Sequence, residues 1–204
     1  MMEHRVENVS QFKGETMRVD FDDAEPVFIH CSVVQELGMR PGIILTEEEI
    51  SEAIRRNNRR RAREWALYLL DERDYGYVEM FKKLNRNYPE DICYEVVNSL
   101  AEQGLIDDRK YAARCAEYYI VTKNRGKYRA KEEMRRRGIP SELIDEALED
   151  YDEGTYSRLR ELVEKKYLRK LTEEDGARKV KASLARQGFG FDEINAVLRE
   201  FDKD

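Results

Sequence analysis

The sequence has little of the residue types that catalysis or metal binding usually requires. Its 204 residues include only two histidines, His4 and His30, and three cysteines without a CxxC pair. No His/Cys cluster therefore has the spacing of a metal site. Neither a glycine-rich phosphate loop ending in GKS or GKT nor a GxGxxG motif is present. These absences predict a protein that is not an enzyme and has no cofactor.

Long apolar runs are also missing. No run approaches the roughly 20 residues that span a bilayer, and the first ten residues lack the apolar core of a signal peptide. The cysteines, Cys31, Cys93 and Cys115, are widely spaced, which fits unpaired thiols in a reducing compartment. We therefore expect a cytoplasmic protein without membrane association. The scarcity of glycine and proline, at 11 and 4, favours helix.

The charges are unevenly distributed along the chain. Residues 1–50 carry 4 basic and 11 acidic side chains, residues 109–137 carry 11 and 3, and residues 139–154 carry none and 7. The net charge of −6 disfavours a general nucleic-acid coat. The segregation still allows local basic stripes that could contact a partner.

Three glycines lie fifty residues apart, and each is followed at +4 and +8 by an apolar or small residue. The sets are Gly76-Met80-Leu84, Gly126-Ala130-Met134 and Gly176-Val180-Leu184. A fixed period of this length predicts stacked repeats, and elongated repeat bodies usually bind along surfaces. Gly138 and Gly188 are expected to close the second and third of these helices in a left-handed conformation, with Asn87 in that place in the first.

The pattern predicts a mainly α fold of three tandem three-helix repeats that form an elongated curved body, preceded by a small strand-containing N-terminal extension. The expected parts are an acidic extension with short strands (1–45), a linking helix and first repeat (46–108), a second repeat (109–154) and a third repeat (155–204). The first helices of the trios are expected at 61–73, 109–123 and 156–170, and the third helices at 90–103, 141–152 and 191–201.

Within the extension, residues 17–21 and 26–30 predict two strands. Thr46 and Glu49 have capping-box spacing, so a helix should begin after Thr46. Asn57-Asn58 could bend or break this helix, whose apolar face we expect to continue to Trp65.

The segment from Leu100 to Ala112, LAEQGLIDDRKYA, resembles the junction between the first two repeats of the bacterial regulatory protein RecX family. Residues 66–70 with Glu79, Phe81 and Leu84 resemble the first repeat of that family. The RRRGI run at 135–139 with Ile144 and Ala147-Leu148 resembles the second. The similarity covers about residues 60–150 well and 151–204 more weakly.

The resemblance implies a helical regulator in the groove of the RecA–single-stranded-DNA filament. Such a protein would inhibit or modulate the recombinase, ATPase and coprotease activities of RecA in DNA repair and the SOS response. The implied partners are the RecA filament and single-stranded DNA, and the chain is expected to be a monomer. Two rival hypotheses are a helical nucleic-acid-binding module that acts without RecA and an adaptor that docks through its N-terminal strands.

Two basic stretches are the candidate RecA- or DNA-facing residues. They comprise Arg56, Arg59, Arg60 and Arg63 in the first stretch, and Lys123, Arg125, Lys127, Arg129, Lys131, Arg135, Arg136 and Arg137 in the second. Such stripes can neutralise phosphates or meet an acidic protein surface. They can equally be solvated faces with partners one turn away, or pair with the acidic residues 145–150.

The repeat junction supplies a second group of residues, with a structural role. These are Leu105, Asp107, Asp108, Tyr111 and Ala112. Asp107 or Asp108 is expected to cap the helix that begins near Arg109. Tyr111 and Ala112 are then expected to face the neighbouring repeat.

Overall fold

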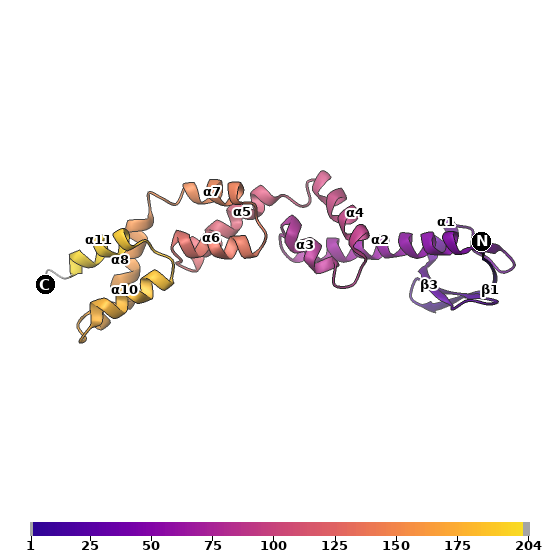
Figure 1. Cartoon of the computed structure of the whole chain (residues 1–204), viewed down its shortest axis with the longest axis horizontal. Helices are drawn as coiled ribbons and strands as arrows, with labels where there is room; N and C mark the ends of the chain where they lie inside the picture. Colours follow the sequence, from indigo (N-terminus) through magenta and orange to yellow (C-terminus); the bar gives the residue numbers. More distant parts are fainter. Residues whose placement is uncertain (1, 202–204) are drawn as a thin grey trace. The chain divides into compact units, whose positions relative to one another are not determined.

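The computed structural model describes residues 2–201, in which a small antiparallel sheet is followed by helices (Figure 1). The described residues form two compact units. Those up to Arg73 together with Phe81–Gln103 make the first, and Asp74–Met80 together with those from Gly104 onward make the second. The mainly helical fold with an N-terminal strand region is therefore confirmed.

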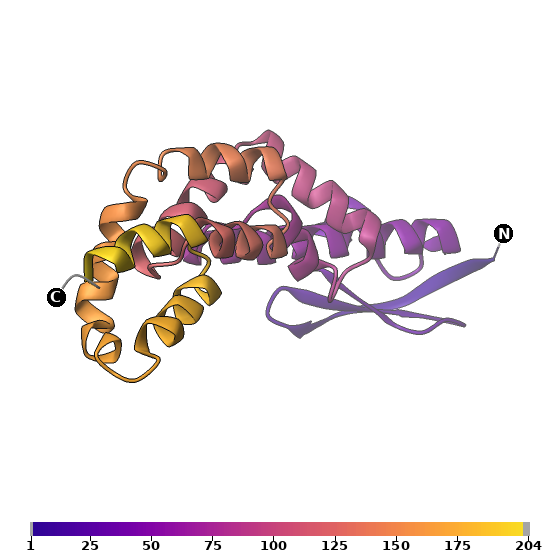
Figure 2. The ribbon, with the colours of Figure 1, turned by 60° about the vertical axis from the view of Figure 1, so that its left-hand side comes forward.

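The sheet has four strands in the order β3-β2-β1-β4, all antiparallel. The strands are β1 (Glu3–Lys13), β2 (Thr16–Phe21), β3 (Val27–His30) and β4 (Ile44–Thr46). Figure 2 shows β1 and β2 as a long paired ribbon. One face of the sheet is buried, and its core includes Val6, Val19, Phe21, Ile29 and Leu45.

The two predicted strands correspond to β2 and β3, but β1 and β4 were not predicted. In β1, pairing with β2 shifts register between Val6 and Asn8 and again between Gln11 and Lys13. These bulges disrupt the two-residue alternation that identifies a strand in a sequence. A buried polar residue, His4, also occupies a core-facing position of β1.

Helix α1 (Cys31–Glu36) lies between β3 and β4 along the chain, and α2 (Glu47–Glu72) follows β4; both contact the sheet. The capping box at the start of α2 is confirmed, because the Thr46 hydroxyl accepts from the Glu49 N–H and Glu49 Oε2 accepts from the Thr46 N–H. The predicted break at Asn57-Asn58 and the predicted start of a separate helix at residue 61 are both wrong, because α2 is continuous from Glu47 to Glu72. Asn57 fits within α2 because its amide accepts from the His30 N–H and donates to the Phe28 carbonyl.

The remaining helices of the first trio are α3 (Tyr77–Leu84) and α4 (Glu90–Glu102), and α4 packs on α2. The prediction that Asn87 has a left-handed conformation is wrong, because the φ angle of Asn87 is not positive. The amides of Asn87 and Tyr88 both donate to the Leu84 carbonyl, so the chain leaves α3 through a right-handed turn.

The second trio consists of α5 (Asp108–Glu117) with the π-helical turn η1 (Tyr118–Thr122), α6 (Lys127–Arg136) and α7 (Ser141–Glu149). The third consists of α8 (Thr155–Lys166), the short α9 (Leu168–Leu171), α10 (Gly176–Arg186) and α11 (Phe191–Phe201). The helix expected at 156–170 is interrupted at Tyr167, whose hydroxyl lies 2.9 Å from Ser183 Oγ.

The glycine-marked helices bury the expected stripe. Met80, Leu84, Ala130, Met134, Val180 and Leu184 are all fully buried. Gly138 and Gly188 close α6 and α10 with φ of 82° and 89°, as predicted. Both also allow close packing between trios: a Cβ on Gly138 would lie 2.4 Å from Val78 Cγ1, and one on Gly188 would lie 2.3 Å from the Arg129 nitrogen.

Candidate interaction surfaces

The four arginines of the first basic stretch lie on one face of α2 and line a hollow of about 700 Å³ bounded also by α1 and α4. Each has a polar partner in the first unit. Arg56 pairs with Glu52 at 2.8 Å, Arg60 with Glu64 at 2.6 Å, and Arg63 donates to Gln103 at 2.8 Å. The four arginines share one face of α2, as their helical spacing predicts. Their partners neutralise much of the positive charge of this face.

Glu95 of α4 is the acidic centre of this hollow. It forms ion pairs with Arg55 and, at 3.8 Å, with Arg59. The second distance exceeds that of a hydrogen bond, and Glu95 Oε2 is a buried oxygen without a hydrogen-bond partner. The Arg59 guanidinium, with a side chain 57% exposed, is therefore the least constrained of the four.

The second stretch is mostly engaged in ion pairs. Lys131 pairs with Asp145 of α7, and Lys127 pairs with Asp152. Arg129 and Arg136 both pair with acidic residues of α6 itself, which are Glu132 and Glu133. Pairing between this stretch and the acidic segment, one of the alternatives from the sequence, is therefore present.

Three exposed cations of the second stretch have no carboxylate partner within residues 2–201. They are Lys123, Arg125 and Arg135. Lys123 Nζ instead lies 5.2 Å from the centre of the exposed Tyr118 ring. The π-helical turn η1 begins at Tyr118 and leaves its ring 42% exposed.

Arg137 differs from its neighbours because its side chain is directed into the second unit. Its guanidinium donates to the hydroxyls of Tyr111 and Tyr119 at 2.8 and 3.0 Å, and lies 3.9 Å from Glu79. Tyr111 in turn donates to Glu79 at 2.5 Å. Arg137 thus connects α6 with α3 and α5. This internal network accounts for an arginine at this position better than contact with a partner at the surface does.

The network changes the titration of its members. Burial raises the pKa of Tyr111, and the hydrogen bond to Glu79 raises it further. Burial alone disfavours the Arg137 charge, but hydrogen bonds to the two tyrosine hydroxyls raise its pKa overall. Arg137 therefore remains charged and Tyr111 remains a neutral hydrogen-bond donor across the ordinary pH range.

The junction residues divide into packed and exposed positions. Asp107 caps α5 by accepting from the N–H groups of Arg109 and Lys110, both at 3.0 Å, and the bond from Lys110 lowers its pKa. Asp108 accepts from the Tyr77 N–H at 2.8 Å, and Tyr111 and Ala112 are buried.

Leu105 is 48% exposed and is not a packed junction residue. The preceding Gly104 has φ of 69°, and after this turn it is Ile106, 5% exposed, that is buried.

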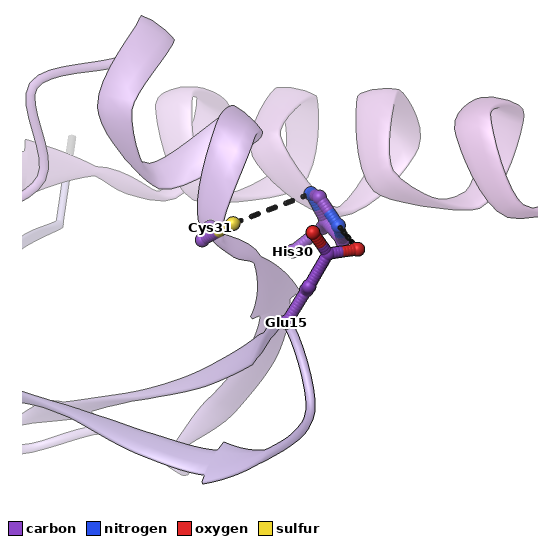
Figure 3. Close-up of side chains that lie close together, drawn as sticks. All are labelled: Glu15, His30 and Cys31. Atoms are coloured by element: carbon purple, nitrogen blue, oxygen red, sulfur yellow. Dashed lines mark hydrogen bonds and ion pairs between the residues drawn. The ribbon is translucent and has the colours of Figure 1, made fainter.

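The fold gathers two groups of potential metal ligands that the sequence spacing did not reveal. The first is Glu15, His30 and Cys31 (Figure 3). His30 Nε2 lies 3.0 Å from Glu15, whereas Nδ1 accepts from the Ser32 N–H and lies 3.8 Å from Cys31 Sγ. Because the two ring nitrogens face different partners, the arrangement fits a cap of α1 and not a shared ion.

The second group is His4, Asp22 and Asp23. His4 Nδ1 lies 2.6 Å from Asp23, and Asp22 accepts from the Arg5 N–H at 2.9 Å. The hydrogen bond raises the pKa of His4 and lowers that of Asp23. This pair therefore holds a buried strand residue and is explained without a metal.

Comparison with known proteins identifies the family. The second three-helix domain of RecX matches residues 107–148, and the third matches residues 152–198. A protein named Regulatory protein RecX from Ectopseudomonas mendocina (strain ymp) is 32% identical over 143 residues, which cover 68% of this chain and 93% of the relative. This chain belongs to the RecX family. A RecX relative from Clostridioides difficile (strain 630) is 24% identical over 200 residues, covering 96% of this chain and 94% of its own.

Solved RecX structures share the fold. A crystal structure of regulatory protein RecX aligns with a TM-score of 0.70 at 23% identity and covers 96% of this chain and 99% of its own. RecX from Lactobacillus salivarius aligns with a TM-score of 0.64 at 26% identity, covering 71% and 97%. Among residues 2–201, no helix combines the length and apolarity needed to cross a membrane.

Sequence patterns missed three features of these surfaces. Glu79, the partner of Arg137 and Tyr111, is separated from them along the chain and carries no local signal. The bonds from Asn57 to β3 are equally non-local. Trp65 was expected on the apolar face of α2 but is 41% exposed, since the buried face passes through Ala62, Ala66 and Leu69.

Proposed function

We propose that this RecX-family protein regulates the RecA recombinase by binding the RecA–single-stranded-DNA filament. Membership of the family carries the proposal, because relatives over most of the chain are named regulatory protein RecX. The protein acts in the cytoplasm as a monomer, in DNA repair and the SOS response. Binding opposes filament growth and so lowers the ATPase, strand-exchange and coprotease activities of RecA.

The exposed cations support a role in binding a negatively charged partner. Arg125 just before α6 and Arg135 in its last turn have no carboxylate partner in the described part of the chain, and Arg59 is the least constrained arginine of its hollow. Forming a contact with phosphate or an acidic surface at these positions breaks no strong internal pair. The paired Lys127 and Lys131 would first have to leave Asp152 and Asp145.

Titration of the full chain into RecA on single-stranded DNA tests the proposal. We expect ATP hydrolysis to fall as the chain is added, and the chain to co-sediment with RecA–DNA filaments. A matched sample without RecA measures binding to the DNA alone. Unchanged hydrolysis and no filament binding at stoichiometric amounts would show that the proposal is wrong.

A further inference from the structure

Two aromatic side chains of α2 face outward. Trp65 and Tyr68 are 41% and 55% exposed, and their rings stack with centres 5.4 Å apart and planes 15° from parallel. The Tyr68 hydroxyl donates to Glu72 at 2.9 Å, which fixes the position of its ring. They line a groove of about 750 Å³ together with the amides of Asn58 and Asn87.

A second aromatic pair lies on the sheet beside the same helix. Phe12 of β1 and Phe28 of β3 are 60% and 43% exposed, and their ring centres are 4.7 Å apart. They line a hollow of about 460 Å³ that also includes Lys13. Exposure of two large apolar rings at one place is unusual for a surface without a binding role.

Arg61 connects the two aromatic pairs because it lines both hollows, as does Glu64. Glu64 is paired with Arg60 at 2.6 Å, and Glu15 at the edge of the sheet-side hollow is bonded to His30. Within residues 2–201, Arg61 and Lys13 therefore remain without a carboxylate partner. The available charge between the aromatic pairs is positive.

We propose that this surface, defined by Phe12, Phe28, Arg61, Trp65 and Tyr68, binds single-stranded nucleic acid through its unpaired bases. Exposed aromatic rings beside cations are the combination that holds a single strand, since every base has a face that can stack and every linkage carries a charge. Arg61 and Lys13 contact the phosphates.

The neighbouring polar groups favour a nucleic acid over an apolar protein segment. Arg61, Asn58 and Asn87 line the same groove as Trp65 and Tyr68, so a ligand there meets polar groups as well as rings, which the apolar face of a hydrophobic helix would leave without partners. Their amide and guanidinium groups can hydrogen-bond base edges and phosphates. All residues of this site belong to the first unit, and the proposal stands independently of the proposed action on RecA.

The fluorescence of Trp65 reports directly on this surface, because it is the only tryptophan in the chain. The probes are a homothymidine oligonucleotide, a duplex of equal length and an abasic strand of equal length, each added to the full chain without RecA. We expect saturable quenching by the oligonucleotide and little by the other two, since only it offers unstacked bases. Equal quenching by all three would indicate phosphate contact alone and would overturn the proposal.

Substitutions then locate the contact. We expect Tyr68→Ala and Arg61→Ala each to weaken oligonucleotide binding, Tyr68→Ala by roughly 5- to 150-fold, the usual loss of one stacked base. The control Leu67→Ala alters an exposed apolar residue of the same helix outside both hollows and should leave affinity unchanged. Circular dichroism confirms that each variant is folded.

Unchanged affinity in folded Tyr68→Ala protein would contradict base stacking here. In a separate titration, RecA protein is added without nucleic acid; a change in Trp65 emission there, with none from any oligonucleotide, would identify a protein-docking face instead and would also overturn the proposal. Because the oligonucleotide assay contains no RecA, its result is separate from that of the proposed function.

Discussion

The backbone of Gly126 lies directly against that of Gly188 in the following trio. The Gly126 N–H donates to the Gln187 carbonyl at 2.9 Å, and the Tyr128 N–H donates to the Gly188 carbonyl at 3.1 Å. Gly138 packs against the Val78 side chain near the start of α3, and Gly188, fifty residues further along, packs against Arg129 near the start of α6. The recurring glycines therefore set the contact between successive trios as well as closing helices.

Gly126→Ala should destabilise the second unit substantially. The new Cβ would lie 2.1 Å from the Gly188 carbonyl group, and two backbones cannot separate without breaking their hydrogen bonds. We expect a loss of about 3 kcal/mol in the free energy of unfolding, at the upper end of ordinary overpacking. Urea denaturation measures it. In the control Gly190→Ala, the Cβ would meet only the flexible Glu193 side chain at 3.1 Å, so a comparable loss there would contradict the explanation.

Asn57→Ala should weaken the contact between α2 and the sheet. Asn57 is 5% exposed and is hydrogen-bonded to the edge of β3 through both its amide atoms. Its loss leaves two backbone groups without these partners, which costs about 1–3 kcal/mol. Hydrogen exchange at the His30 amide should accelerate beyond the change in global stability. The neighbouring Asn58→Ala should leave that amide protected.

Tyr111→Phe should destabilise the second unit by about 1–3 kcal/mol, because it removes the hydroxyl between Glu79 and Arg137. Arg137→Met should also destabilise it, leaving Tyr119 without its donor. A double-mutant cycle measures their coupling. Strictly additive losses would show that the two side chains act independently. Spectrophotometric titration should show one tyrosine ionising later than the rest, as the raised pKa of Tyr111 requires.

The His4–Asp23 pair should make the N-terminal sheet depend on pH. Because the pKa of His4 is raised, the pair stabilises the folded state fully at pH values below the ordinary pKa of 6.5. This stabilisation is lost as the pH rises through the raised pKa. Because the pKa of Asp23 is lowered, its stabilising effect on the folded state is fully present above the ordinary pKa of 3.8. This effect is lost as the pH falls through the lowered pKa. The stability difference between the natural chain and Asp23→Asn should therefore be largest between roughly pH 4 and 6.5. A difference that grows above pH 8 would contradict this assignment; nuclear magnetic resonance titration of His4 gives its pKa directly.

The unpaired cations near α6 should contribute more to filament binding than the paired ones. We expect the double variant Arg125→Ala/Arg135→Ala to lower co-sedimentation with RecA–DNA filaments more than Lys127→Ala/Lys131→Ala. The reason is that the lysines already neutralise Asp152 and Asp145. If the cations contact phosphate, the salt dependence of binding should fall by about one unit of slope per residue removed. An equal effect of the two double variants would show that internal pairing does not select the contacting cations.

The sequence alone determined the repeated helices, because their evidence is local. Caps such as Thr46 and Asp107, left-handed glycines such as Gly138, and apolar stripes such as Met80-Leu84 act within a few residues. Strand β1 could not be predicted from the sequence, because its bulged register depends on pairing with β2.

Tertiary structure decided which charges are available and which residues are exposed. Arg135 and Arg137 are near neighbours in one basic run, yet one is exposed and the other is held by Tyr111 and Tyr119. Trp65 belongs to an apolar pattern but forms an exposed stack with Tyr68. These outcomes depend on partners far away along the chain, so no local pattern could specify them, and the same holds for the packing of Gly126 against Gly188.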